Sequence, residues 1–438
     1  MDKENDIKPW KGSKASPSDK LTPARYIPPI EAFYFLKIGN MWRYFKNEHF
    51  SYWMICCYLF FEFFRPQGIY PQIDVLPWAQ LFLMGALAGA ILDKSVKWVS
   101  SPINKWLIVF AILIYISSLN AYFPELSKKY YIDFYSWFVI YFLIINIVNT
   151  KQRLYLFLII LILCAAKIAA GTSLTFASRG FGFTSWGLRG PPGYFTNSGE
   201  LAILMLVLFP LAFYFYIYMK DKVSLIEKWI LLLFWITPLL TIIGASSRGA
   251  QVALVIQLFM MFRKKLVKFK PLVMIGLLSF TLYSILPEEQ LARFESAGDD
   301  RTSEQRLLYW KHGMEMILEN PVLGVGYFNF APYYQKYHSE DMLYANAQLP
   351  HNIFIQVGTD TGFLGLFAYS MLLIIPFWLS RKRVGMERTG FESHVLSGLL
   401  YGIVGFVLAG QFVTVTYYPF LWITLSFIVA TLNCYRKQ

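Results

Sequence analysis

Long apolar runs, separated by polar segments, follow one another along most of the chain. Because a helix needs about 20 apolar residues to cross a membrane, these runs predict an all-α polytopic membrane protein with about 12 transmembrane helices. A large, partly helical loop precedes the tenth predicted span. The predicted spans cover residues 49–64, 76–92, 104–121, 133–149, 153–171, 198–219, 228–245, 248–262, 270–286, 352–380, 394–413 and 417–434.

The same pattern divides the chain into four segments. Residues 1–48 form a basic tail and an interfacial helix, and residues 49–286 hold the first nine spans with a loop at 172–197. Residues 287–351 form the large loop, and residues 352–438 hold the last three spans and the C-terminus. Loops as long as these two are usually functional or disordered.

Composition excludes an ordinary soluble domain. Hydrophobic residues make up 56% of the chain and charged residues only 15%, whereas soluble domains average roughly 25% charged residues. The four cysteines fall in predicted spans, so we expect no disulfide framework.

The net charge of +13 indicates a membrane orientation. Most of the 40 Lys and Arg residues lie in the N-terminal tail and in every second loop. The positive-inside rule therefore predicts that both termini are cytoplasmic and that the two long loops lie on the opposite side. This distribution explains the charge without a nucleic-acid partner.

A helix is expected inside the large loop. Thr302 is a candidate N-cap, with Gln305 three residues later, and Pro321 follows the end of the apolar periodicity. Arg306 and Trp310 are four residues apart and share one face of this helix.

His351 and Asn352 stand at the start of the tenth predicted span, and nine residues separate Asn352 from Gly362. The positive end of the helix disfavours an imidazolium, so His351 is expected to be a neutral ring that can accept a proton. Alternatively, His351 caps a helix at the membrane interface. Gly358, Gly362 and Gly365 are expected to serve close helix packing, which would hold the His351 end of the helix rigidly against its neighbours.

Arginines in the two loops and at a span end are candidates for phosphate recognition. The planar guanidinium binds oxygen atoms bidentately and stays charged. Arg248 and Arg306 are the strongest candidates, although Arg248 could reach the lipid headgroups and Arg306 could lie on a solvated face. Weaker candidates of the same kind are Arg301, Arg293, Arg179 and Arg189.

No metal-binding motif is recognisable in the sequence. It contains no Asp-x-Asp motif, no His/Cys cluster and no phosphate-binding glycine loop followed by Lys. His312 and His338 are interpreted as bystanders. We therefore expect no metal and no cofactor, and the energy for a reaction must come from the substrate. A pyrophosphate-linked donor would meet that need, because arginines can hold the leaving group.

These residues together resemble the O-antigen ligase and polymerase superfamily, the WaaL-like and Wzy_C-type bacterial membrane glycosyltransferases. The resemblance covers the segment from Ser247–Arg248 to Gly365. Its motifs are Arg306, Trp310, Asn320-Pro321, Gly324-Val325-Gly326, Asn329-Phe330, His351-Asn352 and Gly362-Phe363-Leu364-Gly365.

The resemblance implies a reaction and roles for residues. Such enzymes move a glycan from undecaprenyl-pyrophosphate to an acceptor hydroxyl at the periplasmic face of the bacterial inner membrane, with inversion and without metal or ATP. It implies that His351 is the base and that Arg306 and Arg248 hold the pyrophosphate. Further substrate contacts are expected from Arg301, Asn352, Trp310, Arg179 and Arg189.

Three acceptors are compatible with the resemblance. A lipid A-core sugar would make the protein an O-antigen ligase, which the single compact loop site favours. A growing lipid-linked glycan would make it a Wzy-type polymerase, and a protein hydroxyl a protein O-oligosaccharyltransferase. A lipid-glycan transporter or flippase is the alternative from another class. It should carry charges near mid-membrane, whereas here the candidate site charges gather at one face, with Lys167 as the one exception among them.

Overall fold

The computed structural model describes residues 28–35, 37–184, 187–266, 300–381 and 389–436. Every regular element in these residues is a helix. Short 3-10 helices occur at Ile30–Phe33, Pro71–Ile73 and Ser339–Asp341. The α-helices are α1 (Ile38–Lys46), α2 (Phe50–Phe63), α3 (Pro66–Ile69), α4 (Trp78–Leu92), α5 (Pro102–Leu119), α6 (Pro124–Ile147), α7 (Lys151–Ser178), α8 (Ser198–Met219), α9 (Leu225–Gly244), α10 (Arg248–Leu266), α13 (Arg301–Glu319), α14 (Phe330–Tyr337), α15 (Ile353–Arg381), α16 (Phe391–Ala409) and α17 (Pro419–Arg436).

The chain is a polytopic membrane protein. Within the described ranges, seven helices are long and apolar enough to cross a membrane, namely α5 to α9, α15 and α16. Two further apolar helices, α4 and α17, are shorter. Helices α2 and α10 coincide with the predicted runs at 49–64 and 248–262, and the predicted span 270–286 lies outside the described residues.

Two helices extend well beyond their predicted bounds. Helix α6 begins at Pro124 instead of residue 133, because proline suits the first helical turn and polar residues follow it. Helix α7 continues to Ser178 instead of residue 171. In this last part Thr175 Oγ1 donates to the Gly171 carbonyl oxygen at 3.0 Å, so a polar side chain is satisfied within the helix.

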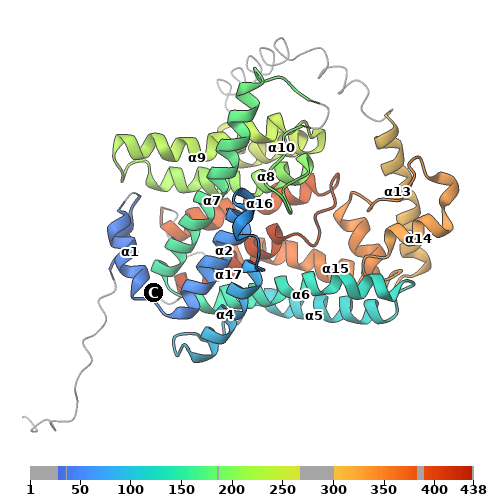
Figure 1. Ribbon diagram of the computed structural model, residues 1–438, viewed down its shortest axis with the longest axis horizontal. Coiled ribbons are helices and arrows are strands. Elements are labelled where there is room, and N and C mark those ends of the chain that lie inside the picture. The colour runs from blue at the N-terminus through green and yellow to red at the C-terminus, as the bar shows by residue number, and fades with distance from the viewer. Residues whose placement is uncertain (1–27, 36, 185–186, 267–299, 382–388, 437–438) are drawn as a thin grey trace, which may run out of the picture.

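Residues 300–350 form a lobe at one end of the molecule. Figure 1 shows α13 and α14 of this lobe at the right, and α1 and the C-terminus at the opposite end. The connection between α5 and α6 holds the lobe, since the Tyr122 backbone N–H donates to the Val325 carbonyl oxygen at 3.1 Å. Helix α13 packs against α15, and α15 packs along α5.

Helix α15 is interrupted inside the bundle at Gly362, where φ is 65° and ψ is −166°. The lobe backbone satisfies the groups that this break frees. Val325 N donates to the Thr359 carbonyl oxygen at 2.7 Å, and Phe363 N donates to the Pro321 carbonyl oxygen at 2.8 Å. A Cβ at Gly362 would lie 2.6 Å from the Pro321 carbonyl oxygen, so glycine is required there for the break.

Candidate functional site

A cavity of about 440 Å³ lies where the N-terminal ends of α8, α10 and α13 meet His351, which stands shortly before α15. Its volume is within the range of pockets that hold small-molecule ligands. Three side chains that the sequence singled out line it together: Arg248, Arg306 and His351. The full lining is Asn197, Ser198, Gly199, Glu200, Ser246, Ser247, Arg248, Gly249, Asp300, Thr302, Arg306, His351, Phe412, Val413 and Thr414.

The positions of the helix ends give the cavity a favourable field for anions. Helix α8 begins at Ser198, α10 at Arg248 and α13 at Arg301, next to lining residues in each case. The first backbone N–H groups of a helix are unpaired within it and carry a partial positive charge. Several helix starts around one cavity therefore favour a phosphate-like ligand.

Arg248 is held at the cavity by Asp300. Its Nη2 atom donates to Asp300 Oδ2 at 2.7 Å, and Asp300 Oδ1 accepts from the Ser303 backbone N–H at 3.1 Å. Burial alone would raise the pKa of Asp300, but the hydrogen bonds from Arg248 and Ser303 outweigh it and lower the pKa to about 2. Asp300, and not the predicted Thr302, is thus the N-cap of α13, because its carboxylate reaches the third N–H of the helix.

Arg306 has a buried donor without a protein partner. Its Nε atom is inaccessible to solvent and makes no hydrogen bond within the described part of the chain. Burial, and then the positive charge of Arg248, lower the pKa of Arg306, but a guanidinium remains charged at neutral pH. An unsatisfied charged donor is unfavourable, and an anion in the cavity would relieve this.

Ser246 is a second polar group of this kind, and sequence reasoning missed it. Its backbone has a φ of 57°, and its buried Oγ atom has no partner among the described residues. Left-handed backbone in a non-glycine residue is uncommon and clusters at functional sites. The polar pair Ser246-Ser247 directly before the start of α10 was the available signal.

His351 lines the cavity with a strained backbone, since its φ is 53°. Its backbone N–H donates to Thr414 Oγ1 at 3.0 Å. The ring atom Nε2 lies 3.0 Å from Gln348 Oε1. Because an amide oxygen only accepts, Nε2 carries the proton and Nδ1 keeps its lone pair. Burial, and then the charge of Arg306, lower the pKa of His351 to about 4, so the ring is neutral near pH 7.

Asn352 and Trp310 fix the backbone on either side of His351 and do not line the cavity. Asn352 is buried, and its Oδ1 atom accepts from the backbone N–H groups of Phe354 and Ile355 at 2.9 and 3.2 Å. Trp310 Nε1 donates to the Pro350 carbonyl oxygen at 2.9 Å. Both side chains therefore hold the histidine in position.

Three predicted arginines lie away from the cavity lining. Arg301 donates to the Leu343 carbonyl oxygen, and its guanidinium stacks 4.9 Å from the centre of the Tyr344 ring. Arg179 and Arg189 are exposed on the segment between α7 and α8. The structure thus brings two of the six candidate arginines into the cavity, and a further one, Arg293, lies outside the described residues.

Glu200 is a cavity residue that sequence reasoning did not single out. It belongs to the first turn of α8, and its Oε1 atom accepts from the Tyr418 hydroxyl at 2.7 Å. The helix-start sequence Asn197-Ser198-Gly199-Glu200 was its only signal. This carboxylate lies on the α8 side of the cavity and can accept a hydrogen bond from a sugar hydroxyl.

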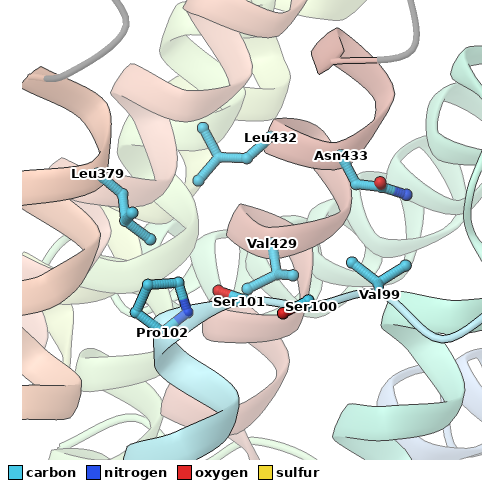
Figure 2. Close-up of a pocket in the computed structure, with 8 residues that line it drawn as sticks. All are labelled: Val99, Ser100, Ser101, Pro102, Leu379, Val429, Leu432 and Asn433. Carbon is cyan, nitrogen blue, oxygen red and sulfur yellow. The ribbon is translucent and has the colours of Figure 1, made fainter.

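Two other cavities differ in size or chemistry. The one in Figure 2, between the segment before α5 and the last turns of α15 and α17, measures about 20 Å³, which is room for a single water molecule. Another, of about 780 Å³, lies between the first 3-10 helix and α1, and its one charged lining residue among those described is Arg43. The described lining of neither cavity combines several arginines with a carboxylate or an imidazole.

Comparisons with known proteins agree with the resemblance seen in the sequence. Residues 230–370 match the family model described as O-antigen ligase, and residues 47–220 match a family of unknown function. The exopolysaccharide production protein ExoQ of Rhizobium meliloti (strain 1021) is 31% identical over 109 residues. That alignment covers 23% of this chain and 25% of the relative.

The O-antigen ligase match runs from α9 into α15, so it includes both cavity arginines and His351. It also includes the break in α15 at Gly362. The chain is therefore a polytopic membrane protein whose residues 230–370 are similar to the O-antigen ligase family.

Proposed function

We propose that the protein transfers a glycan from an undecaprenyl-pyrophosphate donor to an acceptor hydroxyl, with inversion at the anomeric carbon. The observation that carries this proposal is the meeting of Arg248, Arg306 and His351 in one cavity. Cations and a neutral base side by side suit a reaction in which an anion leaves while a hydroxyl loses its proton.

The leaving pyrophosphate would bind at the cationic side of the cavity. Arg306 offers its unpartnered Nε donor, and Arg248 adds a second guanidinium held by Asp300. The Ser246 hydroxyl and the start of α10 supply further donors near the same point. These groups stabilise the charge that develops on the leaving oxygen without a metal ion at the reacting atoms.

His351 would activate the acceptor. Its Nδ1 lone pair takes the hydroxyl proton, the hydroxyl oxygen attacks the anomeric carbon, and the bond from that carbon to the phosphate oxygen breaks. In the free protein the low pKa of His351, about 4, makes it a weak base. A bound pyrophosphate offsets the charge of Arg306 and raises this pKa, so the base becomes stronger only when the donor is present.

The proposed topology places this chemistry at the periplasmic face of the bacterial inner membrane. The basic N-terminal tail and the basic alternate loops support cytoplasmic termini, with the lobe on the opposite side. The full chain would then cross the membrane 12 times, as roughly 20-residue apolar runs in the sequence suggest.

The acceptor that we propose first is a lipid A-core sugar, which would make the protein an O-antigen ligase. The family model over residues 230–370 supports this choice. A growing lipid-linked glycan is the second candidate, because the relative ExoQ is named for exopolysaccharide production. That acceptor would make the protein a polymerase.

The test is transfer by the purified full-length protein in liposomes. Undecaprenyl-pyrophosphate glycan is offered with a core lipid or a peptide, and products are separated by size. One transfer to the core lipid that depends on His351 identifies a ligase, and a ladder of lipid-linked glycans identifies a polymerase. Transfer to the peptide identifies a protein glycosyltransferase. If none of the three acceptors gives a product that is lost in His351→Ala, the proposal is overturned and a transporter is favoured.

A further inference from the structure

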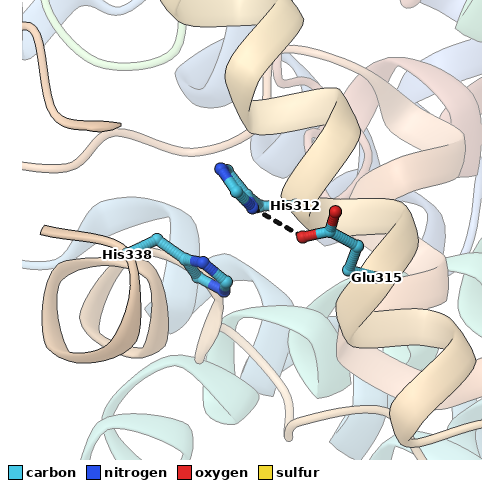
Figure 3. Close-up of side chains that lie close together, drawn as sticks. All are labelled: His312, Glu315 and His338. Atoms are coloured by element: carbon cyan, nitrogen blue, oxygen red, sulfur yellow. Dashed lines mark hydrogen bonds and ion pairs between the residues drawn. The ribbon is translucent and has the colours of Figure 1, made fainter. Parts of the chain in front are cut away.

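A second cluster of titratable side chains lies in the lobe, outside the cavity lining. His312 and Glu315 come from α13, and His338 follows the end of α14. One ligand atom from each can be chosen so that all three lie within 4.8 Å of one another, and Figure 3 shows the three side chains turned toward each other. The sequence did not suggest this cluster.

The hydrogen bonds of His312 define which ring nitrogen faces the cluster. Its Nε2 atom lies 2.6 Å from Asp341 Oδ2, so the proton on this side is held by a carboxylate. Its Nδ1 atom lies 2.6 Å from Glu315 Oε2. With the ring proton on Nε2, Nδ1 has the lone pair that a metal ligand needs. Since two ligand atoms of one tetrahedral Zn²⁺ lie about 3.3 Å apart, the Glu315 carboxylate would move back by less than about 1 Å to bind the ion together with Nδ1.

The donor set is that of a zinc site. Two imidazole nitrogens and one carboxylate oxygen are ligands that Zn²⁺ binds at about 2.0–2.2 Å, with a water molecule as a common fourth ligand. The His312–Asp341 hydrogen bond is the outer contact that orients a metal-binding histidine and sets its tautomer. His312 is buried at 5% exposure, whereas Glu315 and His338 are half-buried, so an ion can enter from solvent.

We infer that His312, Glu315 and His338 bind a zinc-type divalent cation, with Asp341 supporting His312. The site joins α13 to the end of α14, where the two imidazole rings stack with their centres 4.1 Å apart. Because α13 also carries Arg306, the metal would fix the helix that presents this arginine to the cavity. The ion has a structural role and does not touch the reacting atoms. This inference revises the expectation of a protein without a metal, and it does not depend on the proposed transfer.

The test measures metal binding by the purified full-length protein. After chelation and desalting, we expect Zn²⁺ to bind at one equivalent by mass spectrometry, and Co²⁺ to give the visible absorption of a tetrahedral site. The temperature of unfolding should rise with Zn²⁺ concentration, because the ion binds the folded state. Asp341→Asn should bind Zn²⁺ about 10- to 100-fold more weakly.

Variants separate a metal site from a proton-bridged cluster. His338→Ala should lose stoichiometric Zn²⁺ and the Zn²⁺-dependent rise in unfolding temperature, and Glu315→Gln, a milder change at a half-buried position, should do the same. His394→Ala, which removes an imidazole from α16, should leave both unchanged. If the unmodified protein binds no Zn²⁺, or if His338→Ala and Glu315→Gln bind it as well as the unmodified protein, the site does not exist. The three side chains are then held together by hydrogen bonding and ring stacking.

Discussion

Two arginines with buried guanidinium donors have opposite surroundings in this molecule. Arg153, at the start of α7, is 4% exposed, and its Nε and Nη2 atoms donate to Glu48 Oε2 at 2.9 and 2.6 Å. Its Nη1 atom donates to the Ile147 carbonyl oxygen at 2.9 Å. Asp93 lies within 3.8 Å of the same guanidinium, so its charge is balanced within the protein.

Arg306 has the reverse arrangement. Its Nε donor is buried without a partner among the described residues, and the cation of Arg248 is close enough to lower its pKa. The comparison shows that residue type does not decide function here. An arginine whose three nitrogen atoms all donate to protein groups supports the fold. An arginine with an unpaired buried donor can bind an anion that the protein does not supply.

Replacing His351 should have the largest effect on activity. His351→Ala removes the proposed base, and transfer should fall about 10²- to 10⁴-fold in a liposome assay with a lipid-pyrophosphate donor. The unfolding temperature should change little, because among the described residues the side chain has one hydrogen bond, to Gln348. His394→Ala is the matched control and should retain activity. Retained transfer in His351→Ala would remove this residue from the mechanism.

Replacing Arg153 should affect stability and leave the chemistry intact. Arg153→Ala leaves Glu48 and Asp93 buried without their shared cation, which should lower the free energy of unfolding by about 3–5 kcal/mol. Thermal unfolding in detergent measures this loss. The turnover number per folded molecule should stay the same. A stable variant with impaired transfer would contradict the comparison.

Replacing Arg306 should give the opposite result. Arg306→Lys keeps the charge but loses the planar fork, and we expect about a 10²-fold decrease in kcat/KM with an unchanged unfolding temperature. Arg301→Lys is the matched control, because Arg301 lies on the same helix outside the cavity lining. Equal activity of the two variants would mean that the Arg306 fork does not bind the donor.

The smallest effect concerns the protonation of His351. Its pKa should be near 4 in the free protein, and it should rise in Arg306→Gln and on addition of pyrophosphate, as measured by NMR of labelled histidine. Because the unfolded state takes up this proton near its ordinary pKa of 6.5, His351 should reduce stability as pH falls from 6.5 toward 4. A pKa that does not respond to Arg306→Gln would show that burial alone lowers it.

The helical class and most span positions could be predicted from the sequence, because most apolar runs have about the same bounds as the helices. The prediction was wrong where helices leave the apolar layer. The first turns of α6 contain Glu125 and Lys128, and the last turn of α7 contains Thr175 and Ser178. Polarity in these turns resembles a loop, although local hydrogen bonds and ion pairs maintain the helix.

The site could be predicted only as far as single residues have distinctive chemistry. Arg248, Arg306 and His351 stood out in the sequence because cations and an imidazole beside a membrane are conspicuous, and the structure places them around one cavity. Asp300 was missed because it is one of several possible helix caps in a polar run. The pairing of His312 with His338 was missed because it depends on how α14 folds back on α13, which no helical spacing encodes.

The break in α15 has a consequence for how such proteins can be recombined. Segment 321–325 donates and accepts backbone hydrogen bonds inside the gap at Gly362, so the lobe is joined to the membrane bundle along its own main chain. A single-residue insertion in this segment would displace every one of those bonds. A chimera that exchanged the lobe alone would disturb these main-chain contacts with α15. Grafts between similar proteins should therefore carry α13 through α15 together.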